Sequence, residues 1–193
     1  MRVDLPGADV ALEPGWLPGA AADALRAALE RDIPWSQPRL RLYGREVASP
    51  RLACWIGDAG TAYTYSRTRF EPAPWPPALA ALRGAVDAAA GQRFNAVLAN
   101  LYRDGRDAMG WHADDEPELG PEPVIASLSL GATRRFLFKP RAGGASVPLD
   151  LAHGSLLVMR GRTQALYRHA LPRTARPVGA RINLTFRWIR PPA

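Results

Sequence analysis

Cysteine and lysine are almost absent from this chain of 193 residues. The single cysteine, Cys54, cannot form an internal disulfide, which is typical of proteins that fold in a reducing compartment. No apolar run approaches the roughly 20 residues that a membrane-spanning helix needs. The first residues, 1–15, contain acids and prolines where a secretion signal has an apolar stretch. We therefore expect a cytoplasmic protein.

The positive charge of the chain is carried almost entirely by arginine, because Lys139 is the only lysine. The formal net charge is +7 and the isoelectric point is about 10.4. Such a balance favours a polyanionic partner such as nucleic acid. A composition rich in Ala, Arg, Gly and Pro also raises the arginine count without any function. Charge alone therefore leaves a nucleic-acid partner and an ordinary basic surface as equal alternatives.

Two segments of the chain, 20–33 and 76–91, have apolar residues at helical spacing. In most of the remaining chain, apolar and polar residues alternate at strand spacing, in short segments that are bounded by the turn residues Gly, Pro and Asp. The predicted strands cover residues 39–44, 61–70, 94–103, 124–131, 134–140, 154–161, 165–171 and 181–189. This pattern predicts a mainly β (α+β) fold, a sandwich or jelly roll with helices packed on the outside. The length suits one compact domain.

The last predicted strand, "RINLTFRWI", has one apolar face and one polar face. The polar face holds Arg181, Asn183, Thr185 and Arg187. It is either the wet side of a surface strand or a binding surface for an anion. A guanidinium group binds a carboxylate bidentately and stays charged when partly buried. Two arginines with an amide and a hydroxyl between them can hold a dicarboxylate at both ends.

Two of the three histidines form a pattern suited to a metal ion. His112 and Asp114, in "WHADD", stand at i and i+2 and would point to the same side if this segment were a strand, and His169 follows later in the chain. Two imidazoles and one carboxylate are the facial triad of non-haem Fe(II) oxygenases. His-x-Asp alone is a weak signal, and a strand-edge and a surface histidine are the alternative. We interpret His153, beside a glycine, as a turn or hydrogen-bonding residue outside the metal site.

The triad and the polar strand support each other. The strand begins shortly after His169, so we expect the two to be neighbours joined by a loop. A metal triad beside a dicarboxylate clamp fits 2-oxoglutarate, whose keto acid end chelates Fe(II) and whose distal carboxylate binds an arginine. Asn100 and Tyr102, again at i and i+2, can hydrogen-bond the same cosubstrate. Ordinary strand polarity is the alternative for this pair.

Over residues 39–190 the chain resembles the AlkB family of Fe(II)- and 2-oxoglutarate-dependent nucleic-acid demethylases, most closely the subgroup typified by the human homologue 2 protein. The resemblance rests on five segments in one order: "NLYRDGRDAMGWHADDE", "IASLSLGATRRFLFK", "LAHGSLLVM", "YRHALP" and "ARINLTFR". It implies a double-stranded β-helix (jelly-roll) core over 92–193. A nucleotide-recognition lid with a supporting helix would cover 39–91, after an N-terminal extension with one helix over 1–38.

The same resemblance implies a role for each residue of the site. The iron ligands would be His112, Asp114 and His169. Arg181 would bind the distal carboxylate of 2-oxoglutarate and Arg187 its metal-chelating carboxylate end. The cosubstrate pocket would be completed by Asn100, Tyr102, Asn183 and Thr185. The implied cofactors are thus Fe(II), 2-oxoglutarate as cosubstrate, and O₂.

The implied reaction is oxidative demethylation of 1-methyladenine and 3-methylcytosine in DNA, with release of formaldehyde, succinate and CO₂. The methylated edge is inaccessible inside a duplex, so the base must be flipped or the strand single. We expect a monomer in a bacterial cytosol or nucleoid. Its partner would be single- or double-stranded DNA with alkylated bases, without a membrane. The same chemistry on RNA or protein and a non-catalytic basic cupin that binds nucleic acid are the alternatives.

Residues that would contact the substrate also follow from the resemblance. The flipped base would meet Tyr63, Tyr65 and Ser66, and Tyr43 falls at the position of an aromatic finger in the hairpin 39–51. Asp115 and Glu116 would favour a cationic base electrostatically. Packed aromatic residues and solvated loop acids are the alternatives. Phosphate contacts would suit Arg41, Arg45, Arg51, Arg67, Arg69, Arg134 and Arg135, and a solvated surface arginine is the alternative for each. The segment 140–150 is shorter than the corresponding loop of the human-type protein, so duplex preference is harder to predict than demethylation.

Overall fold

The structure is a computed structural model that describes residues 1–42, 45–65 and 68–190, without the side chains of 40–42, 45, 63–65 and 68–70. Its elements, in chain order, are β1 (Asp9–Glu13), α1 (Gly19–Asp32), β2 (Arg39–Leu42), β3 (Arg45–Ala48), β4 (Leu52–Gly57), β5 (Tyr63–Tyr65), β6 (Thr68–Phe70), α2 (Pro77–Ala90), β7 (Ala96–Tyr102), β8 (Met109–His112), the 3₁₀ helix η1 (Pro117–Leu119), β9 (Ile125–Gly131), β10 (Arg134–Pro140), β11 (Val147–Leu151), β12 (Leu156–Arg160), α3 (Thr163–Leu166), β13 (Tyr167–Leu171) and β14 (Arg181–Arg187).

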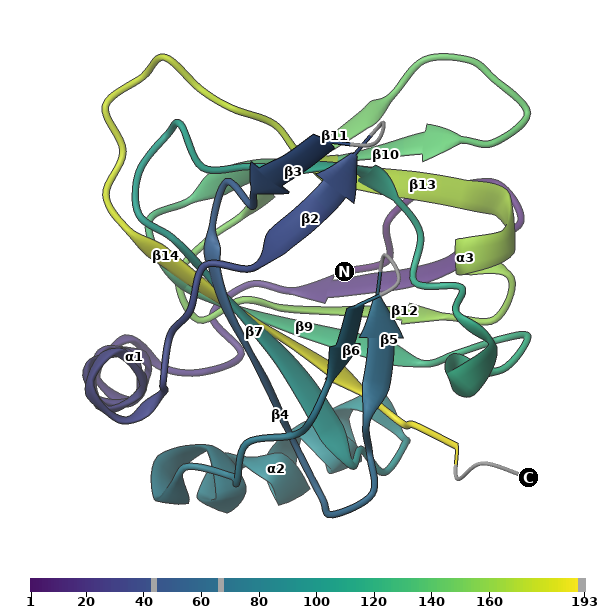
Figure 1. The fold of residues 1–193 in the computed structure, drawn as a ribbon. Helices are drawn as coiled ribbons and strands as arrows, with labels where there is room; N and C mark the ends of the chain where they lie inside the picture. Colours follow the sequence, from purple (N-terminus) through teal and green to yellow (C-terminus); the bar gives the residue numbers. More distant parts are fainter. Residues whose placement is uncertain (43–44, 66–67, 191–193) are drawn as a thin grey trace.

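Two antiparallel sheets form the body of the molecule (Figure 1). The larger has the strand order β1-β12-β9-β14-β7-β4, and the smaller has the order β11-β10-β13-β8. Two hairpins, β2–β3 and β5–β6, form separate two-stranded sheets in front of them. The mainly β architecture with few helices confirms the predicted fold class.

The two long helices begin and end where their sequences predict. Pro76 and Pro77 stand at the start of α2, where the missing N–H of a proline is harmless. Gly91 ends the same helix with φ of 67°, a left-handed conformation that glycine adopts without a steric penalty. The predicted ranges 20–33 and 76–91 therefore match α1 and α2 within one residue at each end.

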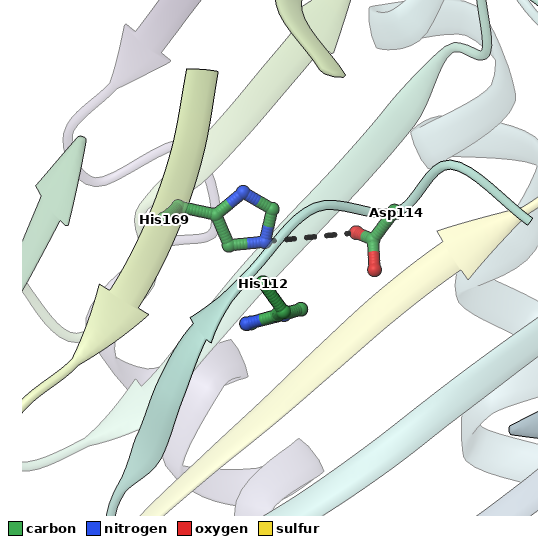
Figure 2. A group of neighbouring side chains, drawn as sticks. All are labelled: His112, Asp114 and His169. Atoms are coloured by element: carbon green, nitrogen blue, oxygen red, sulfur yellow. Dashed lines mark ion pairs between the residues drawn. The ribbon is translucent and has the colours of Figure 1, made fainter. Parts of the chain in front are cut away.

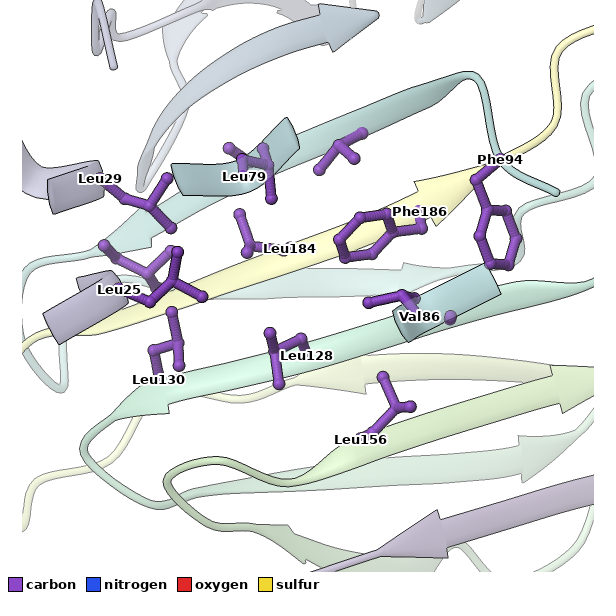
Figure 3. Close-up of a cluster of buried hydrophobic side chains, with 14 of the residues drawn as sticks. Leu25, Leu29, Leu79, Val86, Phe94, Leu128, Leu130, Leu156, Leu184 and Phe186 are labelled. Carbon is purple, nitrogen blue, oxygen red and sulfur yellow. The ribbon is translucent and has the colours of Figure 1, made fainter. Parts of the chain in front are cut away.

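One hydrophobic core lies between these helices and the six-stranded sheet (Figure 3). The helices contribute Leu25, Leu29, Leu79 and Val86, and the sheet contributes Leu128, Leu130, Leu156, Leu184 and Phe186. The Phe186 ring lies 5.9 Å from that of Phe94, at a tilted angle favourable for aromatic pairs. The apolar side chains of β14 therefore point toward the helices.

A second core joins the two sheets to each other. It includes Val10, Leu157 and Met159 from the larger sheet, and Phe138 on β10 and Tyr167 on β13 from the smaller sheet. Because successive side chains of β14 point to opposite faces, its polar residues are directed into this inter-sheet space. They do not form the wet side of a surface strand.

Several elements were not predicted from the sequence. They are β1, β4, β8, η1, β11 and α3, and the predicted strand 61–70 is instead the two strands β5 and β6. The strand β1 lies within the predicted N-terminal extension, yet it pairs with β12 at the edge of the larger sheet. The division into 1–38, 39–91 and 92–193 stays a prediction. Among the described residues, no helix combines the length and apolar character required to cross a membrane.

The buried face of β14 yields a prediction for stability. Phe186 is fully buried, and truncating it to alanine removes its transfer free energy and leaves a cavity. We expect Phe186→Ala to lower the free energy of unfolding by about 3–5 kcal/mol. Val47→Ala, at an exposed position, should change it by less than about 0.5 kcal/mol. Urea denaturation measures both, and equal effects would contradict the packing of β14.

Candidate metal centre and anion pocket

The predicted metal residues meet at one end of the smaller sheet (Figure 2). His112 and His169 face each other across the β8–β13 ladder, with ring centroids 4.2 Å apart. Asp114 follows two residues after His112, and Figure 2 shows it directed toward both rings. The ligand atoms of the three residues all lie within 4.8 Å of one another. The structure thus brings the predicted triad together.

A local irregularity of β8 sets the orientation of His112. The register of the β8–β13 ladder shifts between His169 and Leu171, so β8 contains one additional residue at this point. The Nδ1 atom of His112 lies 2.9 Å from the carbonyl oxygen of Gly110. A carbonyl only accepts hydrogen bonds, so Nδ1 is the protonated nitrogen and Nε2 keeps the lone pair. That tautomer is the one that a metal ligand at Nε2 requires.

Asp114 is held at both its side chain and its backbone. Nη2 of Arg187 donates a hydrogen bond of 2.6 Å to Oδ1 of Asp114, and both residues are buried. The backbone N–H of Asp114 donates to Oε1 of Gln164 at 3.0 Å. Its other carboxylate oxygen, Oδ2, lies 3.9 Å from Nε2 of His169. These contacts fix the carboxylate in the cluster.

The electrostatics of the cluster keep its members in the states that bind a cation. Burial, with a smaller contribution from His112, lowers the pKa of His169 to about 3. Burial also lowers the pKa of His112. Burial alone would raise the pKa of Asp114, but the charge of Arg187 and the neighbouring imidazoles hold it below its ordinary value. At neutral pH the imidazoles are neutral and the carboxylate is ionised.

The polar face of β14 is continued by the strands on both sides of it. β14 pairs with β7 so that Arg181 lies opposite Tyr102 and Asn183 opposite Asn100. On its other side, it pairs with β9 and places Thr185 opposite Ser127. Residues directly opposite in an antiparallel pair share a face. The predicted residues accordingly line one pocket: Asn100, Tyr102, His112, Asp114, His169, Arg181, Asn183, Thr185 and Arg187.

Arg181 is a buried cation at the base of this pocket. Its side chain is almost fully buried, and Nη2 donates to the Ser129 hydroxyl at 2.9 Å. The guanidinium also lies 5.5 Å from the ring centroid of Tyr102. Its Nε atom has no hydrogen-bond partner among the described residues. Burial lowers the pKa of Arg181 to about 10, so it remains charged at neutral pH.

Comparison with known protein families identifies this arrangement. Residues 9–187 match the 2OG-Fe(II) oxygenase superfamily. The chain belongs to that superfamily. The match begins well before residue 39, so it extends further toward the N-terminus than the sequence motifs indicated.

Individual relatives of this oxygenase carry AlkB names. The chain is 41% identical over 194 residues to the "Alpha-ketoglutarate-dependent dioxygenase alkB homolog 3" of Homo sapiens, covering 94% of this chain and 66% of that protein. It is 41% identical over 181 residues to the "DNA oxidative demethylase ALKBH2" of Homo sapiens, covering 88% and 69% respectively. The chain thus spans about two thirds of the length of its alkB homolog 3 relatives.

A solved structure supports the fold independently. The structure titled "The structure of OsALKBH1" superposes with a TM-score of 0.65 at 18% identity, over 97% of this chain and 99% of that one. At this identity the similarity concerns the fold, which is the jelly roll predicted from the sequence motifs.

The residues present fit the two groups that the superfamily uses. Two neutral imidazoles and an ionised carboxylate within 4.8 Å are a suitable donor set for Fe(II). For 2-oxoglutarate, the pocket offers the buried Arg181, whose Nε still has a hydrogen bond to donate. A buried cation is costly unless it is paired, and a carboxylate would supply the partner.

Asn100 presents a defined end of its amide to the pocket. Nε of Arg51 donates to Oδ1 of Asn100 at 2.7 Å, so the NH₂ group is the end left for a ligand. Asn183 is engaged differently, because its Nδ2 donates to the Ser127 hydroxyl at 2.8 Å and to the Leu128 carbonyl at 3.2 Å. A donor at Asn100 suits an anionic cosubstrate.

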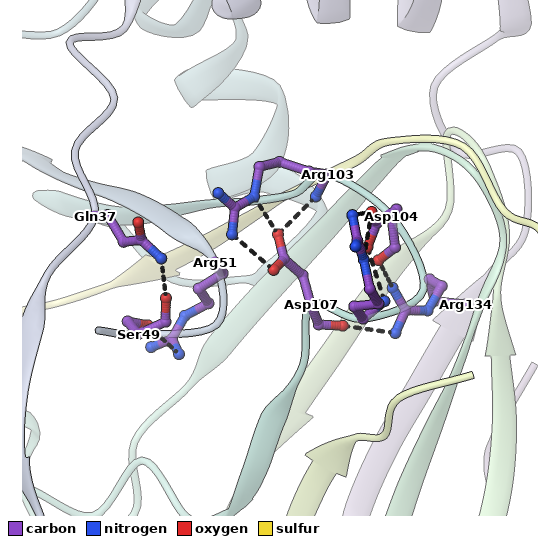
Figure 4. A network of polar contacts seen from close by, with 8 residues as sticks. Gln37, Ser49, Arg51, Arg103, Asp104, Asp107 and Arg134 are labelled. Atoms are coloured by element: carbon purple, nitrogen blue, oxygen red, sulfur yellow. Dashed lines mark hydrogen bonds and ion pairs between the residues drawn. The ribbon is translucent and has the colours of Figure 1, made fainter. Parts of the chain in front are cut away.

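Two arginines predicted to contact phosphates are structural residues instead (Figure 4). Arg51 is buried and donates to Asn100 and to the Ser49 hydroxyl. Arg134 is buried as well, and it donates to the backbone carbonyls of Asp104, Asp107 and Pro172. The prediction for both was wrong, because both guanidinium groups are buried and donate to groups of the chain itself, side-chain oxygens for Arg51 and backbone carbonyls for Arg134.

None of the remaining predicted substrate residues is among the described residues that line the pocket. Asp115 is exposed and forms an ion pair with Arg141, and Glu116 is half-buried; neither is among the pocket-lining residues. Tyr63 and Tyr65 belong to β5, but their side chains are not described. Tyr43 and Ser66 lie outside the described residues. The substrate roles of these residues stay predictions.

Among the other arginines predicted for phosphate contacts, the structure describes only the side chain of Arg135. Arg135 is exposed and lies 3.3 Å from Asp150 in a surface ion pair. Arg41, Arg45 and Arg69 have side chains that are not described, and Arg67 lies outside the described residues. His153 accepts a hydrogen bond from the backbone N–H of Gly131 at 2.8 Å, which confirms its interpretation as a hydrogen-bonding residue.

Sequence reasoning missed several residues that build the site. Ser127 and Ser129 support Asn183 and Arg181 from β9. Their alternation in "IASLSLG" was a usable signal, because two serines at i and i+2 within an apolar strand share one face. Gln164 and Arg51 gave no such signal, since each lies in a segment without periodicity.

The lowered pKa of His169 yields a prediction for the metal-free protein. Between about pH 6.5 and pH 3 the unfolded chain binds a proton at this histidine while the folded chain resists it. The contribution of His169 to the free energy of unfolding is therefore fully present above this window and is lost as the pH falls through it. We expect the free energy of unfolding to drop by on the order of 1 kcal/mol from pH 7 to pH 5. Urea denaturation with a chelator present measures it, and an equally steep loss in His169→Leu would contradict the assignment.

Proposed function

We propose that this chain is an Fe(II)- and 2-oxoglutarate-dependent demethylase of N-alkylated bases in nucleic acid, with DNA as its substrate. The proposal depends on one observation: the cluster of His112, Asp114 and His169 opens into a pocket that also contains the buried cation Arg181. A metal that binds a keto acid and a cation that binds its distal carboxylate are the two requirements for 2-oxoglutarate.

Each part of the chain then has a defined task. His112, Asp114 and His169 hold the iron, which together with 2-oxoglutarate and O₂ supplies the oxidising chemistry. Arg181 and Asn100 bind and orient the cosubstrate. Arg187 keeps the carboxylate of Asp114 ionised and in place, and its predicted contact with the metal-chelating carboxylate end of 2-oxoglutarate stays part of the proposal. The apolar residues Leu98, Phe136 and Leu171 also line the pocket and exclude water from it.

The identity of the substrate is supported by relatives and by charge. Two of the relatives are named as a DNA oxidative demethylase and an alpha-ketoglutarate-dependent dioxygenase. The net charge of +7 favours a polyanion. We propose 1-methyladenine and 3-methylcytosine as lesions, with release of formaldehyde, succinate and CO₂. Such a base would enter from a single strand or after flipping from a duplex.

Two alternatives are separable from this proposal. The same chemistry on RNA or protein predicts turnover without a preference for DNA. A non-catalytic basic module predicts salt-sensitive nucleic-acid binding that is unchanged in His112→Ala and in Asp114→Ala, and no affinity for 2-oxoglutarate. The ordered donor set around Asp114 favours the enzymatic proposal, because a module that only binds nucleic acid has no need of it.

Replacement of Arg181 tests the cosubstrate site. Arg181→Met keeps an unbranched apolar stem and removes the guanidinium, so it should weaken the binding of 2-oxoglutarate to the Mn(II)-loaded protein about 10- to 100-fold. Arg173→Met, at an exposed arginine, is the matched control and should leave the affinity unchanged. Calorimetric titration measures the affinity of each variant for 2-oxoglutarate. If Arg181→Met binds it as tightly as the wild-type protein does, 2-oxoglutarate does not bind at Arg181.

The demethylation itself is tested by comparing substrates. With Fe(II), 2-oxoglutarate and O₂ present, we expect formaldehyde release from single-stranded and duplex DNA that contains 1-methyladenine or 3-methylcytosine. His112→Ala should abolish the release because an iron ligand is lost. Methylated RNA and a methylated peptide serve as comparison substrates. No turnover on any of them by protein with bound iron and 2-oxoglutarate would disprove the proposed function.

A further inference from the structure

Gln164 is a buried polar residue directly behind the metal cluster. It lies in the single turn of α3, with only 1% of its surface exposed. Its Oε1 accepts the N–H of Asp114 at 3.0 Å. We propose that Gln164 is a positioning residue that fixes Asp114 for metal binding. This inference rests on the proposed iron site, and it is independent of which substrate is demethylated.

The backbone of Asp114 needs a partner from outside the sheets. The strand β8 ends at His112, so the ladder to β13 supplies no acceptor two residues later. Asp114 is buried, and a buried N–H without a partner is unfavourable because it loses its hydrogen bonds to water. The amide oxygen of Gln164 accepts this hydrogen bond. Without it the segment after His112 would have to move toward water, and the Asp114 carboxylate would move with it.

The orientation of the Gln164 amide follows from the same hydrogen bond. Only the oxygen of the amide accepts from an N–H, so the NH₂ group points the other way. There Nε2 lies 3.4 Å from Sδ of Met159, a weak acceptor whose residue lines the pocket. Gln164 therefore connects the metal-binding segment to the wall of the cosubstrate pocket on β12.

The position of α3 is itself fixed from two directions. The Thr163 hydroxyl accepts the N–H of Asp9 at 3.2 Å, which ties the turn to β1. On the exposed side, Nε of Arg141 donates to the Gln164 carbonyl at 3.2 Å, and its Nη2 pairs with the carboxylate of Asp115. Asp114 is thus held at its carboxylate by Arg187 and at its backbone by Gln164.

A metal site benefits from such support because ordered ligands lose less entropy on binding. Groups that orient metal ligands from outside the coordination sphere commonly change metal affinity about 10- to 100-fold when they are removed. The expected consequence of losing the Gln164 oxygen is therefore weaker metal binding by a protein that is still folded.

The experiment compares Mn(II) binding, followed by electron paramagnetic resonance, in three variants. Gln164→Leu removes the acceptor at similar size and should weaken Mn(II) binding about tenfold or more. Gln164→Glu keeps an acceptor oxygen at the same place and should stay within about threefold of wild type. Gln92→Leu removes an amide in the turn after α2 that, among the described residues, donates only to the neighbouring Arg93 carbonyl, and should bind Mn(II) as wild type does.

Wild-type Mn(II) affinity in Gln164→Leu, or an equal loss in the Leu and Glu variants, would overturn the proposal. If Gln164→Leu does not fold, hydrogen exchange of the Asp114 amide is measured in the metal-free wild-type protein instead. Slow exchange supports the proposed role of Gln164, and exchange as fast as in an open loop overturns it. Turnover is not measured in either arm. A failure of the proposed demethylation would therefore leave this result unaffected.

Discussion

The buried ion pair between Arg187 and Asp114 is the interaction on which the site depends. Arg187 is the last residue of β14 in the larger sheet, and Asp114 follows β8 of the smaller one, so their contact joins the two sheets at the metal cluster. A buried pair of this kind offsets its desolvation only with good geometry and further hydrogen bonds. The backbone N–H of Asp114 adds such a bond by donating to Oε1 of Gln164, so the segment that carries the carboxylate is held as well.

The same constraint explains why the apolar and polar residues of β14 are separated so strictly. A shift of one residue in register would turn Arg181 and Arg187 toward the helices and Phe186 into the pocket. Pairing on both sides, with β7 and with β9, prevents that shift. The helices α1 and α2 then cover the apolar face, and the stability of that core permits a second, polar surface to be buried in the same sheet.

The fold class, the two long helices and most residues of the site could be predicted, because periodicity and a few specific motifs encode them. The alternation of "RINLTFRWI" specified which residues share a face, and the triad residues were recognisable by type and spacing. Short elements such as β8, at four residues with a register shift, have no periodicity to detect. The roles of Arg51 and Arg134 were also hidden, since a buried arginine that donates to side-chain oxygens or backbone carbonyls looks the same in sequence as one on the surface.

What the sequence motifs could not reveal is how the ligands are oriented, and orientation decides whether a cluster binds a metal. The tautomer of His112 depends on the carbonyl of Gly110, and the direction of the Asn100 amide depends on Arg51 from the segment before β4. Each contact connects residues whose pairing is set only when the sheets assemble. The donor set is therefore a property of residue type, whereas its readiness for Fe(II) and a dicarboxylate is a property of the folded chain.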